Sequence, residues 1–281
     1  MIGTYSTGGK LVCIKGAGDV ASAVAHRLFT EGYSVALIES SAPTAPRRRM
    51  SFVQAVFDSE AELENVRAVR VGSVIALMQI LEEHEAIPLI VGDLVPSFEL
   101  PKADILVDAR MRKKERPEIQ IHEAPFTIGL GPNFHAGITT HVVIETNWGE
   151  HLGQVIYQGE SESYTGQPRE VAGVARGRYT YAACDGTWRT SLEIGQRITA
   201  GKILGSVGPV VMHAEITGIV RGVTKDGLTV SAGTKIVDVD PRGDERFISG
   251  ISERPRRIAE GVLQAVREWE ASHPEFVRQR K

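Results

Sequence analysis

The feature that most constrains this chain is a short apolar run at residues 11–14, which leads directly into two glycines. Such a run is typical of a buried parallel strand, and Gly16 and Gly18 allow a tight turn because they carry no Cβ. Apolar residues then recur at helical spacing over residues 20–29. A strand, a glycine turn and a helix N-terminus together form an anion site, because free N–H groups and the positive end of the helix dipole face the ligand.

This turn matches the dinucleotide-binding fingerprint. Gly16, Gly18 and Ala21 stand at its three positions, the third being the accepted alanine. A second strand over residues 33–38 ends at Glu39, where an acidic side chain would hold a ribose hydroxyl. The alternative is a βαβ unit whose glycines only allow close helix packing. The cofactor-binding residues predicted here are Gly16, Ala17, Gly18, Asp19, Val20 and Glu39.

Charged residues follow two of the predicted strands. Arg47, Arg48 and Arg49 come shortly after the second strand, and guanidinium groups match the geometry of phosphate or carboxylate. Arg48 and Arg49 are the predicted binding residues among them. The alternative for them is a solvated basic loop. Asp108 and Arg110 end a further buried strand, where ligands of open α/β sheets gather. They are site candidates, with mutual pairing as the alternative.

The stretch at residues 124–137 is dense in glycine. Such a loop exposes backbone N–H groups in a concave nest that suits an anion, and the alternative is a tight strand-to-loop turn. Its predicted binding residues are Gly129, Gly131, Pro132 and Asn133. The nearby histidines lack a recognised ligand spacing, so no metal site is predicted.

Strands and helices alternate through the first half, which predicts an α/β fold with a Rossmann-like parallel sheet over residues 1–170. A length of 281 residues suggests about two domains. A net charge of -3 lacks the excess of basic residues that is typical of nucleic-acid-binding proteins. No apolar run is long enough to span a bilayer. Residues 1–7 lack the features of a signal peptide, so we expect a cytoplasmic protein.

From residue 171 to 250 the predicted strands are short and glycine turns are frequent. This pattern resembles biotinyl/lipoyl domains, which are small β barrel-sandwich hybrids. Carrier domains bear a modified lysine in an exposed hairpin, and the matching hairpin at residues 207–213 has none. The resemblance therefore implies a structural, docking or ligand-covering module. A C-terminal helix within residues 251–281 has one apolar face, which should pack on the first domain or on a second subunit.

Taken together, several motifs resemble one family, the accessory proteins of selenium-dependent molybdenum hydroxylase systems, often called YqeB type. Its Rossmann half is similar to that of XdhC-type maturation factors. The resemblance covers nearly the whole chain and rests on residues 14–21, 25–28, 48–52, 106–110, 129–137, 142–149 and 240–243.

The resemblance implies a protein that acts in the maturation of a molybdenum hydroxylase, its expected partner. It would bind the molybdenum cofactor, or a nucleotide-linked form of it, for delivery or modification. One alternative is an oxidoreductase that uses NAD or another adenine nucleotide, on the strength of the glycine turn and Glu39. Another is a non-catalytic docking scaffold. The sequence leaves open whether a reaction is catalysed and whether the chain forms a homo-oligomer.

Overall fold

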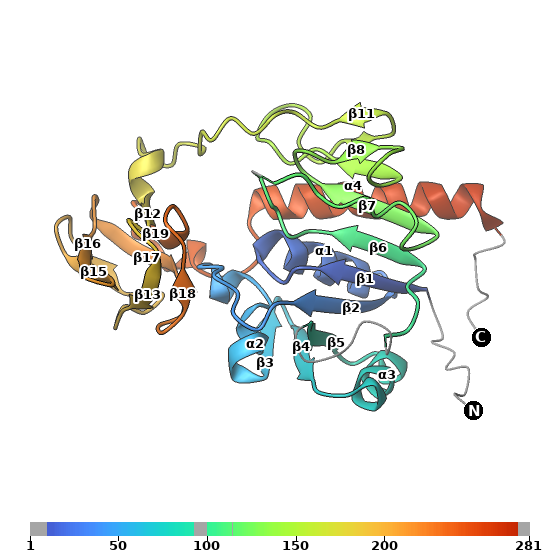
Figure 1. The fold of residues 1–281 in the computed structure, drawn as a ribbon, viewed down its shortest axis with the longest axis horizontal. Helices are drawn as coiled ribbons and strands as arrows, with labels where there is room; N and C mark the ends of the chain where they lie inside the picture. Colours follow the sequence, from blue (N-terminus) through green and yellow to red (C-terminus); the bar gives the residue numbers. More distant parts are fainter. Residues whose placement is uncertain (1–9, 93–99, 114, 275–281) are drawn as a thin grey trace.

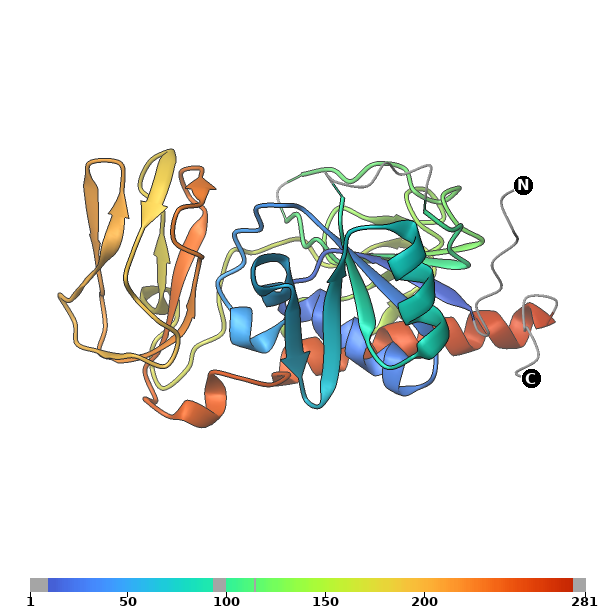
Figure 2. The ribbon, with the colours of Figure 1, turned by 90° about the horizontal axis from the view of Figure 1, so that it is seen from below.

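The computed structural model describes residues 10–92, 100–113 and 115–274. The elements form two units side by side, a larger α/β unit and a smaller β unit (Figures 1 and 2). Residues 1–7, which carry the prediction about a signal peptide, lie outside the described residues. None of the helices in the described ranges combines the length and apolar character needed to cross a bilayer.

The α/β unit is built on one large mixed sheet. Its central strands are parallel, and an antiparallel strand closes each edge. From one edge to the other the strands are β10 (Val155–Ile156), β9 (Val142–Ile144), β7 (Phe126–Leu130), β6 (Ile105–Asp108), β1 (Leu11–Lys15), β2 (Ser34–Glu39), β5 (Ile87–Val91), β4 (Val66–Val71) and β3 (Glu60–Leu63). A short antiparallel pair, β8 (His135–Ala136) and β11 (Gly159–Glu160), lies beside it.

Helices cover both faces of this sheet (Figure 1). On one face, α1 (Asp19–Thr30) and α4 (Glu253–Ser272) pack together on the apolar side chains of β1 and β2. The predicted apolar face of the C-terminal helix is buried here, in the core of the α/β unit. On the other face lies α3 (Val74–Glu83), whose first turn is capped by the Ser73 side chain. The short helix α2 (Gln54–Asp58) follows the 3-10 turn η1 (Arg48–Met50).

The β unit consists of two small antiparallel sheets around a core centred on Trp188, which is fully buried. One sheet has the order β12 (Tyr179–Tyr181), β19 (Lys235–Asp240), β17 (Gly218–Val223), β14 (Arg197–Ile198). The other has the order β16 (Val210–His213), β15 (Ile203–Val207), β13 (Gly186–Arg189), β18 (Thr229–Val230). The turns η3 (Arg176–Arg178) and η4 (Glu245–Phe247) flank the unit.

The α/β class is correct, but the finer prediction of a Rossmann-like parallel sheet followed by a barrel-sandwich hybrid is wrong. In a Rossmann sheet successive strands lie side by side outward from the first. Here β5 lies beside β2, and the earlier strand β4 lies outside it. Apolar periodicity indicates which segments become strands, whereas lateral order depends on how the helices pack, which periodicity does not encode. The antiparallel edges and the division of the β unit into two sheets were missed for the same reason.

The loop after β2 ties the two units together. The amide of Val223 in β17 donates to the carbonyl of Pro46 at 2.9 Å, and the Thr224 hydroxyl donates to the carbonyl of Thr44 at 2.8 Å. A Cβ on Gly222 would lie 2.9 Å from the Pro46 backbone, so glycine permits this close approach. The loop at residues 40–46 therefore joins the α/β unit to the β unit.

Candidate functional site

A cavity of about 870 Å³ lies between the two units, within the size range of small-molecule sites. It opens at the carboxyl ends of the parallel strands, where Pro132 and Thr146 contribute, and it extends to β12, β17 and β19 of the β unit. A strap at residues 162–172, which has no regular structure, lines it and connects the units (Figure 1). The lining includes nine arginine and lysine side chains but only three glutamates, so its character is strongly cationic.

Arg47 bridges the units at the floor of this cavity. Its Nη1 donates to Asp19 Oδ2 at 2.9 Å, and its Nε donates to Asp238 Oδ2 at 2.7 Å. Asp19 begins α1, and Asp238 is fully buried in β19. Burial opposes ionisation of Asp19, but Arg47 and other cations outweigh it and lower the pKa of Asp19 to about 2. Asp19 is therefore ionised at neutral pH, and Arg47 pairs with both Asp19 and Asp238.

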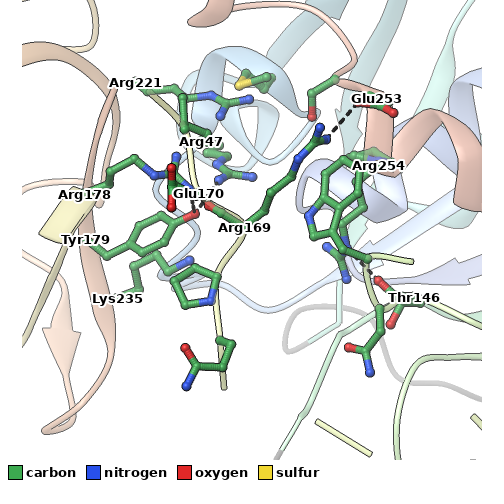
Figure 3. A pocket seen from close by; sticks show the side chains of 18 of the residues that line it. Arg47, Thr146, Arg169, Glu170, Arg178, Tyr179, Arg221, Lys235, Glu253 and Arg254 are labelled. Atoms are coloured by element: carbon green, nitrogen blue, oxygen red, sulfur yellow. Dashed lines mark hydrogen bonds and ion pairs between the residues drawn. The ribbon is translucent and has the colours of Figure 1, made fainter. Parts of the chain in front are cut away.

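Two further arginines of the β unit are buried with unused hydrogen-bond donors. Arg178 is 3% exposed and Arg221 is 8% exposed. Arg178 donates from Nη2 to the Tyr179 hydroxyl at 2.9 Å, but its Nε and Nη1 donate to no atom of the described residues. The Nε of Arg221 is likewise unpartnered there. Figure 3 shows both side chains with Arg47 and Tyr179 on one side of the cavity. Asp238 lies 3.9 Å from Arg178 and Asp240 lies 4.0 Å from Arg221, which balances part of their charge. Buried donors without acceptors are costly, so the unused N–H groups on this side of the cavity favour an anion that accepts from them.

Three more cations line the cavity without a carboxylate partner in the described ranges: Lys113 from the loop after β6, Lys235 at the start of β19 and Arg254 at the start of α4. Burial and the charge of Arg254 lower the pKa of Lys113 to about 8. Burial and the charge of Arg47 lower the pKa of Lys235 to about 8. Burial and Arg47 also lower the pKa of Arg254. These cations destabilise one another, as expected of a site that binds an anion.

The N-terminus of α4 faces the same cavity. Residues 252–255 line it, and the side chain of the preceding Ser252 does not cap the helix. Arg254 lies in the first turn, where the helix dipole disfavours a cation. Its Nε donates to the carbonyl of Thr146 at 2.7 Å, which holds the guanidinium at the cavity wall (Figure 3). Arg169 of the strap pairs with Glu253 at 3.0 Å and lies over the Trp148 ring at 4.2 Å.

The predicted glycine turn lies apart from this cavity. Gly16 has a positive φ of 105° and packs against the backbone of Ala109. The amide of Ala17 donates to Glu39 Oε2 at 2.8 Å, so Glu39 is engaged by the turn itself. Asp19 is held by Arg47, and Val20 is buried in the core. The anion-binding groups of this turn are thus occupied by side chains of the chain itself.

The predicted charged candidates also lie outside the cavity. Arg48 donates from Nε to the carbonyl of Val223 at 2.9 Å, and Arg48 and Arg49 line a separate hollow of about 530 Å³. Asp108 is buried and accepts from the Arg110 Nε at 3.0 Å and from Gln120 at 2.8 Å. These contacts match the alternative of mutual pairing for Asp108 and Arg110.

Of the predicted 129–133 residues, only Pro132 lines the cavity. Gly129 makes room for the Phe134 ring, and Gly131 lies beside Thr146 with a positive φ of 92°. Asn133 supports the site indirectly, because its Nδ2 donates to the carbonyls of Lys113 at 3.2 Å and Glu115 at 3.0 Å. No group of histidine, cysteine, aspartate or glutamate suited to a metal ion occurs among the described residues.

Sequence reasoning included Arg47 in a basic run but missed the other cations that form this site: Lys113, Arg178, Arg221, Lys235 and Arg254. They come from segments far apart in the sequence. One signal was available, namely the basic residue in the first turn of the C-terminal helix, which opposes the helix dipole.

No protein-family model matches the chain. A curated protein of Escherichia coli (strain K12), described as "Uncharacterized protein YqeB", is 39% identical over 263 residues, which cover 94% of this chain and 48% of that protein. The chain is similar to YqeB. It spans about half the length of this relative. The resemblance to YqeB is thereby confirmed in name, and the name carries no molybdenum or selenium function with it.

Three solved structures are similar at low level. The ectoine utilization protein EutE (DoeB) of Ruegeria pomeroyi is 13% identical, with 82% of this chain and 85% of that chain covered and a TM-score of 0.25. A succinylglutamatedesuccinylase/aspartoacylase of Rhodobacter sphaeroides is 14% identical, with 82% of this chain and 85% of that chain covered and a TM-score of 0.24. An aspartoacylase family protein of Mesorhizobium loti is 12% identical, with 83% of this chain and 84% of that chain covered and a TM-score of 0.24. At these TM-scores, none of these structures carries its activity over to this chain.

The predicted role in the maturation of a molybdenum hydroxylase, with its molybdenum and selenium chemistry, is wrong: of the residues on which cofactor binding was based, only Pro132 lines the cavity. The alternative of an NAD-dependent oxidoreductase rested on the glycine turn, which does not line it either. The geometry gives a physical reason, because Glu39 and Asp19 occupy the turn on which nucleotide binding was based. The predicted cofactors and the hydroxylase partner stay predictions.

Proposed function

We propose that this protein binds a small molecule bearing phosphate groups in the cavity between its two units. The observation that carries the proposal is the convergence of Lys113, Lys235 and Arg254 on one cavity, with no carboxylate partner among the described residues. Each comes from a different segment, so their assembly is a product of the fold rather than of a basic run.

Phosphate is the anion that best matches these groups. The uncapped N-terminus of α4 offers backbone N–H groups and a positive dipole end. The guanidinium of Arg254 beside it can bind two phosphate oxygens at once. On the opposite side, the unused donors of Arg178 and Arg221 supply further sites for oxygen atoms. A ligand with more than one anionic group would contact both sides of the cavity.

Calorimetric titration with inorganic pyrophosphate tests this function. The wild-type chain should bind the probe, and Arg254→Gln should weaken binding about 10- to 100-fold, since a hydrogen bond to a charged group contributes about 1.5–3 kcal/mol. Arg257→Gln is the matched control, because Arg257 is exposed on the same helix and lies outside this cavity. Equal affinities for the two variants, or no binding by the wild-type chain, would refute the proposal.

A further inference from the structure

Lys235 stands in surroundings unusual for a lysine that only binds anions. It begins β19 and is the cross-strand partner of Tyr181 in β12, so a sheet fixes its backbone. Its Nζ lies 3.7 Å from the centroid of the Tyr179 ring. The amine therefore rests on an aromatic face, and no carboxylate of the described chain forms an ion pair with it.

Two cations and two carboxylates act on this amine, and burial is the largest influence on it. Arg47 and Lys113 disfavour its protonated form, while Asp238 and Asp19 favour it more weakly than burial and Arg47 disfavour it. Both carboxylates are held by Arg47, which limits their influence on Lys235. The Tyr179 hydroxyl accepts a hydrogen bond from Arg178 Nη2 at 2.9 Å, which holds the ring under the amine in place.

We propose that Lys235 forms an imine with the carbonyl carbon of a phosphorylated aldehyde or ketone bound in this cavity. The inference rests on the proposed function and deepens it, because it names the carbonyl as the second group of the ligand. The phosphate would be bound by Arg254, Lys113 and the N-terminus of α4, and the carbonyl would face Lys235 across the cavity.

The chemistry balances without another reactant. The neutral amine attacks the carbonyl carbon and forms a C–N bond, while a proton moves from nitrogen to the former carbonyl oxygen. Loss of that oxygen with the second amine hydrogen as water leaves the C=N bond. A lysine pKa of about 8 leaves about a tenth of the amine neutral at pH 7. Lysines that form Schiff bases are activated in this way, by burial and by a neighbouring cation.

Reductive trapping with pyridoxal 5′-phosphate tests the inference, because this probe carries an aldehyde and a phosphate. After borohydride reduction, peptide mass analysis should find the label mainly on Lys235. Excess pyrophosphate should protect that residue, and pyridoxal, which lacks the phosphate, should label it at least tenfold more slowly. The labelling rate should reach half its maximum near pH 8.

Two variants separate imine formation from charge. Lys235→Arg keeps the cation but cannot form an imine, so it should retain pyrophosphate binding and lose the label. Lys202→Met is the matched control, because Lys202 is an exposed lysine of the same unit and outside the cavity; it should leave the label on Lys235 unchanged.

The outcomes distinguish the two proposals. Label spread evenly over exposed lysines, or concentrated on Lys113, would overturn the assignment to Lys235. Pyrophosphate binding without any trapping at Lys235 would refute the imine and leave the anion site in place. Trapping at Lys235 that pyrophosphate does not affect, in a chain that binds no pyrophosphate, would refute the anion site instead.

Discussion

Two helix N-termini in this molecule have opposite environments. The first, of α1, follows the glycine turn and begins with Asp19, and the amide of Ala17 just before it is bound by Glu39. The second, of α4, follows an uncapped Ser252, carries Arg254 in its first turn and faces a cationic cavity. The positive end of α1 is balanced by carboxylates of the chain itself, whereas at α4 the first-turn Glu253 is paired with Arg169 and unpaired cations line the cavity beside it.

The difference shows that a glycine-turn motif is weaker evidence for an anion site than a group of cations without carboxylate partners. A glycine turn and a helix N-terminus offer N–H groups wherever they occur, but here the chain itself fills that position at α1. At α4 the dipole and the cations repel one another, and a bound anion would relieve both. Four experiments act on this contrast, beginning with the largest expected effect.

Arg47 lines the cavity and pairs with Asp19 at the N-terminus of α1. Its removal should therefore have the largest effect on the free energy of unfolding. Arg47→Met leaves Asp19 and Asp238 without their shared partner, and Asp238 is fully buried. Breaking a buried pair in this way costs about 3–5 kcal/mol, which urea unfolding followed by circular dichroism would measure. Arg49→Met is the control, because Arg49 is exposed, and it should cost less than about 0.5 kcal/mol. A similar small cost for Arg47→Met would contradict the bridging role.

The pH dependence of anion binding should have an intermediate effect. Lys113 and Lys235 have pKa values lowered to about 8, so both lose their charge as the pH rises through that value. Affinity for sulfate, whose own charge is constant over this range, should fall at least tenfold between pH 7 and pH 9.5, since a hydrogen bond to a charged group is worth about 1.5–3 kcal/mol and both lysines lose their charge. A chain with both lysines replaced by methionine should lose this pH dependence; if it keeps the full tenfold fall, other groups are responsible.

The same lowered pKa values fix the sign of an effect on stability. Between pH 8 and the ordinary lysine pKa of 10.5, the unfolded chain binds more protons than the folded chain. The free energy of unfolding contributed by these two lysines therefore rises with pH in that window. Unfolding measured without ligand should show this rise in the wild-type chain and a smaller one in the double variant.

The smallest effect is expected at the glycine turn. Gly18 has an ordinary φ of -67°, and a Cβ there would have no neighbour within 4 Å. Gly18→Ala should therefore change the free energy of unfolding by less than about 0.5 kcal/mol and leave pyrophosphate affinity unchanged. A nucleotide site would respond differently, because the second glycine of the fingerprint lets the backbone approach the pyrophosphate. Loss of pyrophosphate binding in this variant would move the site to α1.

Local sequence patterns were sufficient to predict strands, helices and the α/β class. The run at residues 11–14 became β1, and the apolar face of residues 258–269 became the buried side of α4. Strand order and the two-sheet β unit could not be derived, because they follow from packing between distant segments. The convergence of Lys113, Lys235 and Arg254 on one cavity could not be derived for the same reason, because these residues come from distant segments.

The candidate residues predicted from the sequence have different roles in the structure. Glu39 and Asp19 do lie at a helix N-terminus, as the fingerprint requires, but they contact the chain instead of facing a cavity. Asn133 braces the backbone of Lys113 and so serves the site without lining it. A sequence shows which residues are charged but not which of them pair with each other. The pairing, seen only in the structure, determines where unpaired charge remains.

A crystal structure of the protein with pyrophosphate tests the central claim most directly. The account predicts electron density for the probe in the cavity between the units, beside Lys113, Lys235 and Arg254 at the start of α4. Density over the Gly16–Gly18 turn at the start of α1, with none in that cavity, would contradict it.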